Sequence, residues 1–155
     1  MIRVGIIGFG YWGPNLARNF NISSSTKLLK IADTNSKRCE LAQKNYPKVE
    51  VTSNPDYLIT ASDIDLVVIA TPVSTHFELA IKALENGKHV WIEKPIASSS
   101  EEAIKIANKA DQKNLIVMID HTYLFTGAVR KIKEALTAGQ LGKLYYYDSV
   151  RVNLG

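Results

Sequence analysis

Residues 6–17, "IIGFGYWGPNLA", carry three glycines in the spacing G-x-G-x-x-G, at Gly8, Gly10 and Gly13. The stretch directly follows an apolar run and opens a segment of helical period. Between a strand and a helix, the first glycine permits a tight turn, the second lets a diphosphate approach the backbone, and the third lets helix and strand pack closely. The free N–H groups at the start of such a helix attract the diphosphate. The stretch therefore predicts a dinucleotide-binding turn.

An acidic residue supports this interpretation. The segment "KLLKIAD" is typical of a second strand and places Asp33 at its end, about 20 residues beyond the turn, where a carboxylate can bind the adenosine ribose. An acid there repels the 2′-phosphate of NADP, so we predict NAD, while Lys37 and Arg38 lie close enough to leave NADP open. Two alternatives remain at this point: a purely structural turn with Asp33 as a helix cap, and an S-adenosylmethionine site.

Short runs rich in Val and Ile alternate with segments of helical period along most of the chain. This alternation is typical of an α/β fold with a doubly wound parallel sheet flanked by helices. Thr75 and Glu78 form a capping-box pattern before one helix, and Gly87 stands where that helix would end. The predicted strands lie near residues 2–7, 27–32, 49–52, 65–70, 88–92 and 115–119.

The last quarter of the chain departs from this pattern. A predicted helix, "AVRKIKEALTAG", precedes "QLGKLYYYDSVRVNLG", whose alternating aromatic and β-branched residues predict a strand. We expect residues 1–122 to form a dinucleotide-binding domain and residues 123–155 to lead into a second α+β domain absent from this chain. An unpaired terminal strand would also favour pairing with another copy, so we expect a homo-oligomer, with a dimer as the simplest form.

Composition excludes several classes of protein. The chain has 155 residues, 46% hydrophobic and 22% charged, which suits a globular domain. Its net charge of +4 comes from scattered residues, which argues against nucleic-acid binding. The apolar runs are far shorter than the roughly 20 residues of a membrane span, and no charged leader precedes the first strand, so we expect a cytoplasmic protein. Cys39 is the only cysteine, which excludes an internal disulfide and a cysteine-based metal cluster, and no metal is expected.

Polar and small residues follow three of the predicted strands. In a doubly wound sheet, ligands bind outside the carboxyl ends of the strands, so these residues should converge on one crevice. A lysine there can hydrogen-bond a hydroxyl or carbonyl and exchange a proton with it, and partial desolvation would bring its pKa nearer neutrality. We therefore predict Lys94 to be catalytic, the alternative being a solvated surface charge. The three groups are Ala70, Thr71 and Pro72; Glu93, Lys94 and Pro95 in "HVWIEKPIAS"; and Asp120, His121 and Tyr123.

Three stretches, "VGIIGFGYWGPNLARNF", "DLVVIATPVSTHFELAIKALENGKHVWIEKPIA" and "LGKLYYYDSVRVNLG", together resemble the Gfo/Idh/MocA oxidoreductases. The resemblance covers essentially the whole chain as the family's N-terminal NAD(P)-binding Rossmann domain. The T-P pair followed by Thr75 and His76, and the E-K-P triplet, are more discriminating than the glycine turn. Methyltransferases do not share them.

The resemblance implies that Lys94 is the catalytic lysine, touching both the nicotinamide ribose and the reacting hydroxyl of the substrate. Glu93 would lie near the nicotinamide, and Pro95 would shape the turn through a trans or a cis bond. His76 would line the cofactor cleft, or serve only as a first-turn helix residue. The predicted cofactor-binding residues are Gly8, Phe9, Gly10, Tyr11, Trp12, Gly13, Asp33, Ala70, Thr71, Pro72, Thr75, His76, Glu93, Lys94 and His121.

Within the family, "HTYLF" and "YYYDSVRVNLG" most resemble sugar-nucleotide 3-dehydrogenases, which oxidise the C3 hydroxyl of a UDP-linked N-acetylhexosamine or its uronic acid. The implied substrate contacts are Lys94, Tyr123, Arg151 and Asn153, with the arginine fork suited to phosphate or carboxylate. Residues 145–147, three tyrosines, fit a sheet better than a ligand site.

Family members continue into an open antiparallel sheet that binds the substrate and supplies an aspartate and a histidine to the proton relay. The chain lacks that part, so we expect it to bind NAD and to turn over poorly. The alternative is a stand-alone NAD-binding module, a redox-sensing or assembly subunit whose tail pairs with a partner chain.

Overall fold

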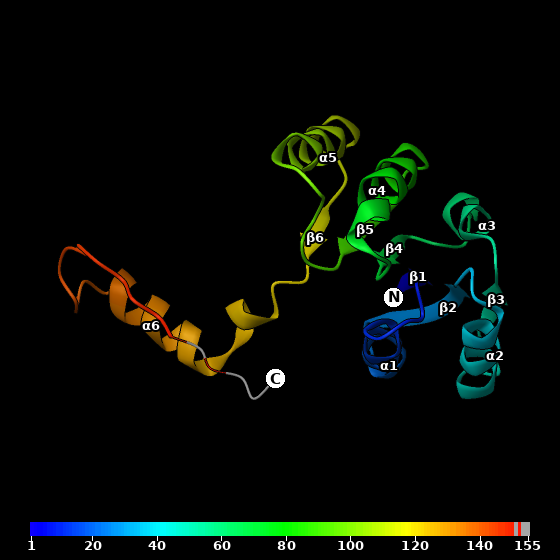
Figure 1. Ribbon diagram of the computed structural model, residues 1–155, viewed down its shortest axis with the longest axis horizontal. Helices are drawn as coiled ribbons and strands as arrows, with labels where there is room; N and C mark the ends of the chain where they lie inside the picture. The colour runs from blue at the N-terminus through cyan, green and yellow to red at the C-terminus, as the bar shows by residue number, and fades with distance from the viewer. Residues whose placement is uncertain (151, 153–155) are drawn as a thin grey trace. The chain divides into compact units, whose positions relative to one another are not determined.

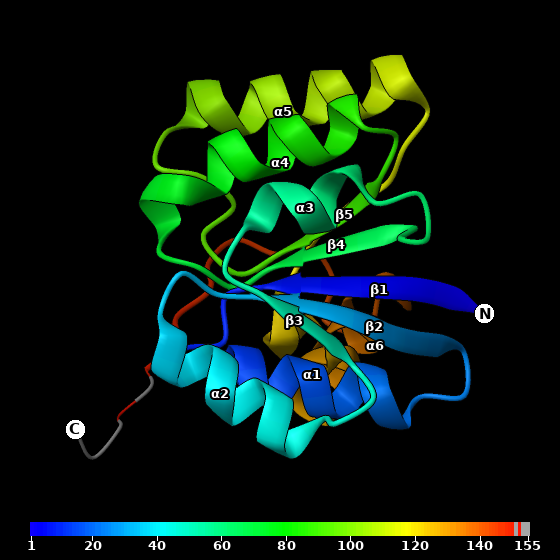
Figure 2. The same cartoon turned by 90° about the vertical axis from the view of Figure 1, so that its right-hand side faces the viewer.

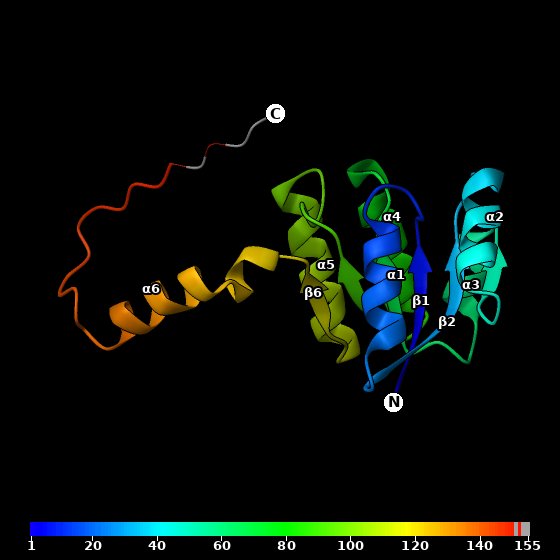
Figure 3. The same cartoon turned by 90° about the horizontal axis from the view of Figure 1, so that it is seen from below.

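Six parallel strands form a single sheet in the computed structural model, which describes residues 1–150 and 152 (Figure 1). The strand order is β3-β2-β1-β4-β5-β6, the order of a doubly wound dinucleotide-binding sheet. Figure 3 shows β6 and β2 toward opposite edges of this sheet. The fold class predicted from the sequence is confirmed. The strands are β1 (Ile2–Ile7), β2 (Thr26–Ala32), β3 (Glu50–Thr52), β4 (Leu66–Ile69), β5 (His89–Ile92) and β6 (Val117–Ile119).

Helices cover both faces of the sheet (Figure 2). One face carries α1 (Gly13–Ile22) and α2 (Ser36–Asn45), and the other carries α3 (Pro55–Thr60), α4 (His76–Glu85) and α5 (Ser100–Lys113). A short 3₁₀ turn, η1 (Val73–Thr75), precedes α4. No helix in the described part of the chain is both long and apolar enough to cross a membrane.

The protein has two hydrophobic cores, one on each face of the sheet, because the side chains of each strand alternate between the two faces. Ile6 and Ile31 are fully buried against α1 and α2, whereas their chain neighbours Ile7 and Ala32 are buried against α3 and α4. Successive residues of a strand face opposite sides, and a sheet covered on both sides must be apolar on both. The continuous Val and Ile runs of the sequence therefore form central strands.

The helix ends agree with the sequence in part. Gly87 follows α4 with φ +74°, the left-handed conformation expected of it, and Ser99 caps α5 by accepting a hydrogen bond from the Glu102 N–H (3.2 Å). The capping box predicted at Thr75 is wrong. Its hydroxyl instead hydrogen-bonds to the Pro72 carbonyl (2.8 Å), because η1 runs directly into α4 and leaves Thr75 with a helical backbone.

The chain divides into two compact units, Met1–Asp120 and His121–Gly155. The second unit contains η2 (Thr122–Phe125) and α6 (Gly127–Thr137). The strand expected after α6 is absent from residues 144–150 and 152, which form neither helix nor strand. A strand needs a neighbour for its backbone hydrogen bonds, and the described chain offers none here. The three tyrosines at 145–147 are correspondingly 63–84% exposed.

Candidate cofactor-binding site

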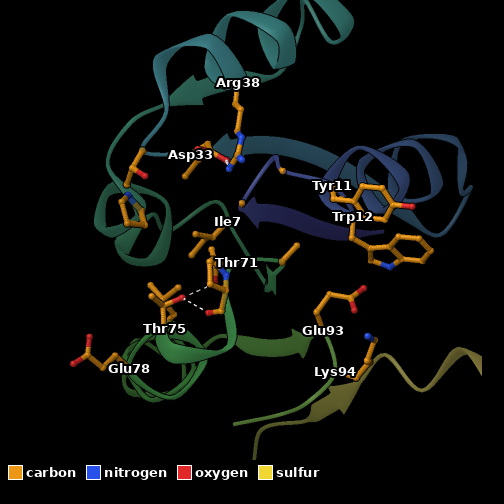
Figure 4. A pocket seen from close by; sticks show the side chains of 18 residues that line it. Ile7, Tyr11, Trp12, Asp33, Arg38, Thr71, Thr75, Glu78, Glu93 and Lys94 are labelled. Atoms are coloured by element: carbon orange, nitrogen blue, oxygen red, sulfur yellow. Dashed lines mark hydrogen bonds and ion pairs between the residues drawn. The ribbon is translucent and has the colours of Figure 1, made fainter. Parts of the chain in front are cut away.

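A cavity of about 650 Å³ lies at the carboxyl ends of β1, β2, β4 and β5 (Figure 4). In the sheet, β1 pairs with β2 on one side and with β4 on the other, so the cavity sits where the strand order reverses. Open α/β sheets bind ligands at this place. The lining residues are Ile7, Gly8, Gly10, Tyr11, Trp12, Ala32, Asp33, Thr34, Arg38, Pro55, Ala70, Thr71, Pro72, Thr75, Glu78, Leu79, Glu93 and Lys94.

The three glycines of the turn meet three different requirements. Gly8 has φ +96°, and a Cβ there would lie 2.6 Å from the Ala70 carbonyl oxygen. A Cβ on Gly13 would lie 2.1 Å from the Gly8 carbonyl oxygen, so this glycine lets α1 pack against the turn. Gly10 is not crowded by backbone, since the nearest atom to its Cβ position is the Arg38 Nη1 at 3.4 Å. Its missing side chain leaves room in the cavity itself, where a diphosphate can approach the backbone.

Asp33 ties the glycine turn to the end of β2. It is 6% exposed, its Oδ2 accepts the Phe9 N–H (2.7 Å), and its Oδ1 accepts the Asn35 N–H (2.8 Å). The Arg38 Nη1 lies 3.6 Å from Oδ2. Each carboxylate oxygen has more than one lone pair, so Asp33 can hold the turn and still accept a hydrogen bond from a ribose hydroxyl. The Phe9 side chain is buried away from the cavity, and only its backbone takes part in this contact.

His76 links two loops from behind the cavity wall. It is 1% exposed, and its Nδ1 and Nε2 lie 2.9 Å from the carbonyl oxygens of Pro95 and Thr71 respectively. His76 does not line the cavity, which is one of the two roles expected for it. It is the first residue of α4, which is the other role. The Lys94–Pro95 bond is cis, one of the two forms expected.

Glu93 and Lys94 lie at the end of the cavity that also holds Tyr11 and Trp12, away from Asp33 and Arg38 (Figure 4). Glu93 has one carboxyl oxygen, Oε1, that is buried without a partner in the described part of the chain. Burial, followed by the neighbouring Asp120 carboxyl, raises the pKa of Glu93 to about 7, while the backbone N–H and charge of Lys94 act in the opposite direction. The Lys94 side chain itself is exposed, so the described residues do not provide the desolvation expected for it.

Several predicted residues lie elsewhere. Gly13 and Phe9 support the turn without lining the cavity. His121 and Tyr123 belong to the second unit, where Tyr123 is 54% exposed. Arg151 and Asn153 lie outside the described residues. No group of three or more His, Cys, Asp or Glu side chains in the described ranges, 1–150 and 152, is arranged to hold a metal ion.

Other lining residues were not singled out by the sequence. Glu78 and Leu79 follow Thr75 by three and four residues and so share its face of the helix. This spacing in the sequence could have predicted that they line the same cavity. Thr34 directly follows Asp33 in the chain. Pro55 lines the cavity because α3 packs against the sheet, and no local sequence pattern predicts that packing.

Strand order, the glycine turn and an acid at the end of β2 define a dinucleotide-binding domain of the Rossmann class. The residues present suit an NAD(P) molecule, because the cavity runs from Asp33 past the Gly10 backbone, which has no side chain to block a diphosphate, to Glu93 and Lys94. Residues 2–121 match the family described as "Oxidoreductase family, NAD-binding Rossmann fold" (GFO_IDH_MocA), and the chain belongs to this family.

Known relatives agree with this membership. The chain is 31% identical over 147 residues to the scyllo-inositol 2-dehydrogenase (NAD(+)) of Bacillus subtilis, covering 94% of this chain and 43% of the relative. Among solved structures, it is similar to apo scyllo-inositol dehydrogenase from Lactobacillus casei, with TM-score 0.85 and 28% identity, over 92% of this chain and 43% of that one. It is also similar to biliverdin reductase in complex with biliverdin and NADP+ from Synechocystis, with TM-score 0.80 and 29% identity, over 88% and 43%. The chain thus spans less than half the length of these relatives.

Proposed function

We propose that this chain is the cofactor-binding part of an NAD-dependent oxidoreductase that transfers hydride between nicotinamide and the carbon bearing a hydroxyl of a sugar or sugar nucleotide. The observation that supports this most strongly is the single cavity that joins Asp33 at one end to Glu93 and Lys94 at the other, past the glycine turn. Asp33 would bind the adenosine ribose, the Gly10 backbone and the start of α1 the diphosphate, and Glu93 and Lys94 the nicotinamide end.

The bound cofactor would supply the hydride acceptor, and the protein would supply position and proton transfer. Lys94 projects from the loop after β5, where its exposed ammonium can reach a substrate at the open end of the cavity. In the proposed reaction Lys94 orients the reacting hydroxyl and exchanges its proton. His76 would position the Lys94 loop indirectly, because it holds the Pro95 carbonyl against the loop after β4.

The proposed cofactor is NAD, with NADP less favoured. The nearly buried Asp33 carboxylate lies where a 2′-phosphate would bring further negative charge. Arg38 lines the same end of the cavity, and its positive charge would favour the 2′-phosphate of NADP. The named relatives include one NAD-dependent enzyme and one complex with NADP+, so the choice rests on this balance of charges.

The proposed substrate is a UDP-linked N-acetylhexosamine or its uronic acid, oxidised at C3. This finer assignment rests on the resemblance of "HTYLF" and "YYYDSVRVNLG" to sugar-nucleotide dehydrogenases. The scyllo-inositol dehydrogenases among the relatives support the coarser class, a hydroxyl on a sugar-like ring. We also propose a homo-oligomer, supported by the exposed tyrosines at 145–147, and a cytoplasmic location, supported by the single cysteine.

A second candidate function is a dinucleotide-binding module without catalysis. The exposure of Lys94 favours it, because nothing in the described chain desolvates the amine or holds a substrate against it. Oxidation of a UDP-N-acetylhexosamine with formation of NADH, lost in Lys94→Ala, would exclude the module. Cofactor binding without turnover in any longer form of the protein would favour it.

Calorimetric titration with NAD and with NADP tests the proposal, with Gly10→Ala as the informative variant. An alanine at 10 meets only the flexible end of Arg38, so the fold should persist while the cavity loses its room for the diphosphate. Gly127→Ala is the matched control, because nothing lies within 4 Å of its Cβ position and it does not line the cavity. We expect binding that Gly10→Ala weakens at least tenfold and Gly127→Ala leaves unchanged. Equal binding by all three proteins would refute the proposed site.

A further inference from the structure

Two carboxyl groups end neighbouring strands beside Lys94. The register of β5 and β6 pairs Ile92 with Ile119, and the Asp120 N–H donates to the Ile92 carbonyl at 2.8 Å. The next residue on each strand, Glu93 and Asp120, is therefore a neighbour across a strand spacing of about 4.8 Å, with side chains leaving the sheet on the same side. The sheet itself thus places two acids side by side at the carboxyl end of its strands.

In the described part of the chain, two negative charges at this place are compensated only in part, by Lys94 and by the Trp12 indole N–H. Asp120 is 6% exposed, and its Oδ2 accepts the Trp12 indole N–H at 3.4 Å. The Glu93 Oε1 is buried with no partner in the described chain, although Glu93 lines the cavity. Two carboxylates that share a desolvated site do not both ionise readily, and one proton between them relieves the repulsion. The raised pKa of Glu93, about 7, agrees with this geometry.

We propose that Glu93 and Asp120 form a proton-sharing pair that responds to the charge of the nicotinamide, releasing its proton when the oxidised cofactor binds and keeping it when the reduced cofactor binds. The inference rests on the proposed function, which puts the nicotinamide at this end of the cavity. The oxidised ring carries a positive charge and favours an ionised pair, whereas the reduced ring is neutral and gives no such preference. Binding of oxidised cofactor and loss of one proton are then linked.

Other titratable groups adjoin the pair in the sequence or belong to the cavity and its supporting loops. Lys94 follows Glu93 and His121 follows Asp120 in the chain, Tyr11 is on the α1 side of the cavity, and His76 contacts the Pro95 carbonyl. Histidine is the usual switch near neutral pH, so the experiment must separate His76 and His121 from the pair by substitution.

The test is the pH dependence of the dissociation constants of NAD+ and NADH, measured by calorimetry between about pH 6 and 8. For one linked proton, NAD+ affinity should rise with pH by several-fold, with a ceiling of about tenfold per pH unit, while NADH affinity stays level. Glu93→Gln and Asp120→Asn should each remove this difference. Glu78→Gln, an exposed acid on the same cavity, and the His121→Gln and His76→Gln variants should retain it.

Three results would overturn the inference: the same pH dependence for both cofactors, a slope that survives in Glu93→Gln and Asp120→Asn, or a slope that disappears in a histidine variant. A carboxyl ¹³C NMR titration of the free protein checks the pair without cofactor. One carboxyl should titrate near pH 7, and its pKa should fall toward the ordinary range, without reaching it, in the Asp120→Asn variant, where burial still acts. A titration entirely in the ordinary range in the unsubstituted protein also overturns the inference. Absence of binding at every pH refutes the proposed function and the inference with it, whereas binding without linkage refutes the inference alone.

Discussion

The Glu93→Gln substitution should stabilise the protein above neutral pH and have little effect in mild acid. The pKa of Glu93 rises from 4.5 to about 7 on folding, so between these values the native state binds more protons than the unfolded chain. The free energy of unfolding contributed by this group therefore falls as the pH rises from about 4.5 to 7. Glutamine resembles the protonated acid and does not lose this contribution.

A shift of this size corresponds to about 3 kcal/mol if the group were fully desolvated. Glu93 lines an open cavity and retains some solvent contact, so screening reduces the expected gain to about 1–2 kcal/mol at pH 8. Urea unfolding of both proteins at about pH 5 and pH 8 measures this difference. Glu78→Gln removes an exposed charge from the same cavity and is the control. A gain that is equal at both pH values, or a wild type that is the more stable at pH 8, would refute the reasoning.

Three further predictions concern the rest of the first unit. Gly13→Ala should destabilise the protein by about 1–3 kcal/mol in urea unfolding and abolish NAD binding, because its Cβ would lie 2.1 Å from the Gly8 carbonyl oxygen. Arg3 holds the pKa of Asp65 at about 2, through a side-chain and then a backbone hydrogen bond, so this pair stabilises the fold above about pH 4 and loses its effect as the pH falls toward 2. Asp65→Asn should therefore cost about 0.5–1 kcal/mol at pH 7, allowing for its exposure, and clearly less at pH 2, where about half of the native carboxyl is protonated. Asn114, with φ +54°, should tolerate glycine but lose about 1 kcal/mol of thermal stability on change to alanine.

Local chemistry made the cofactor half of the fold predictable. An α/β sheet with a dinucleotide-binding turn explains three sequence features together. They are the glycine spacing, the acid at the end of the second strand and the unbroken apolar strands. The structure puts Gly8 at positive φ, seats Gly13 against the Gly8 carbonyl and buries Asp33 beside the turn. These contacts lie within about 30 residues in the sequence, where spacing alone constrains geometry.

The remaining features depend on contacts that no local pattern encodes. The tail at residues 144–150 has strand-forming residues but no neighbour to pair with, so its propensity has no effect. The family resemblance implied that His76 lines the cleft, yet packing turns its ring toward two carbonyls behind the wall. The pairing of Glu93 with Asp120 depends on the register of β5 against β6, which becomes visible only in the folded sheet.

The most direct test of the central claim is a map of backbone amide NMR shifts during titration of the chain with NAD. We expect changes concentrated at residues 8–13, around Asp33, and at Thr71 and Lys94, which line the cavity or form the glycine turn beside it. The groove between α4 and α5, lined by Phe77, Lys105 and their neighbours, should show none. Changes confined to that groove, or no saturable change at all, would contradict the assignment of this cavity to the dinucleotide.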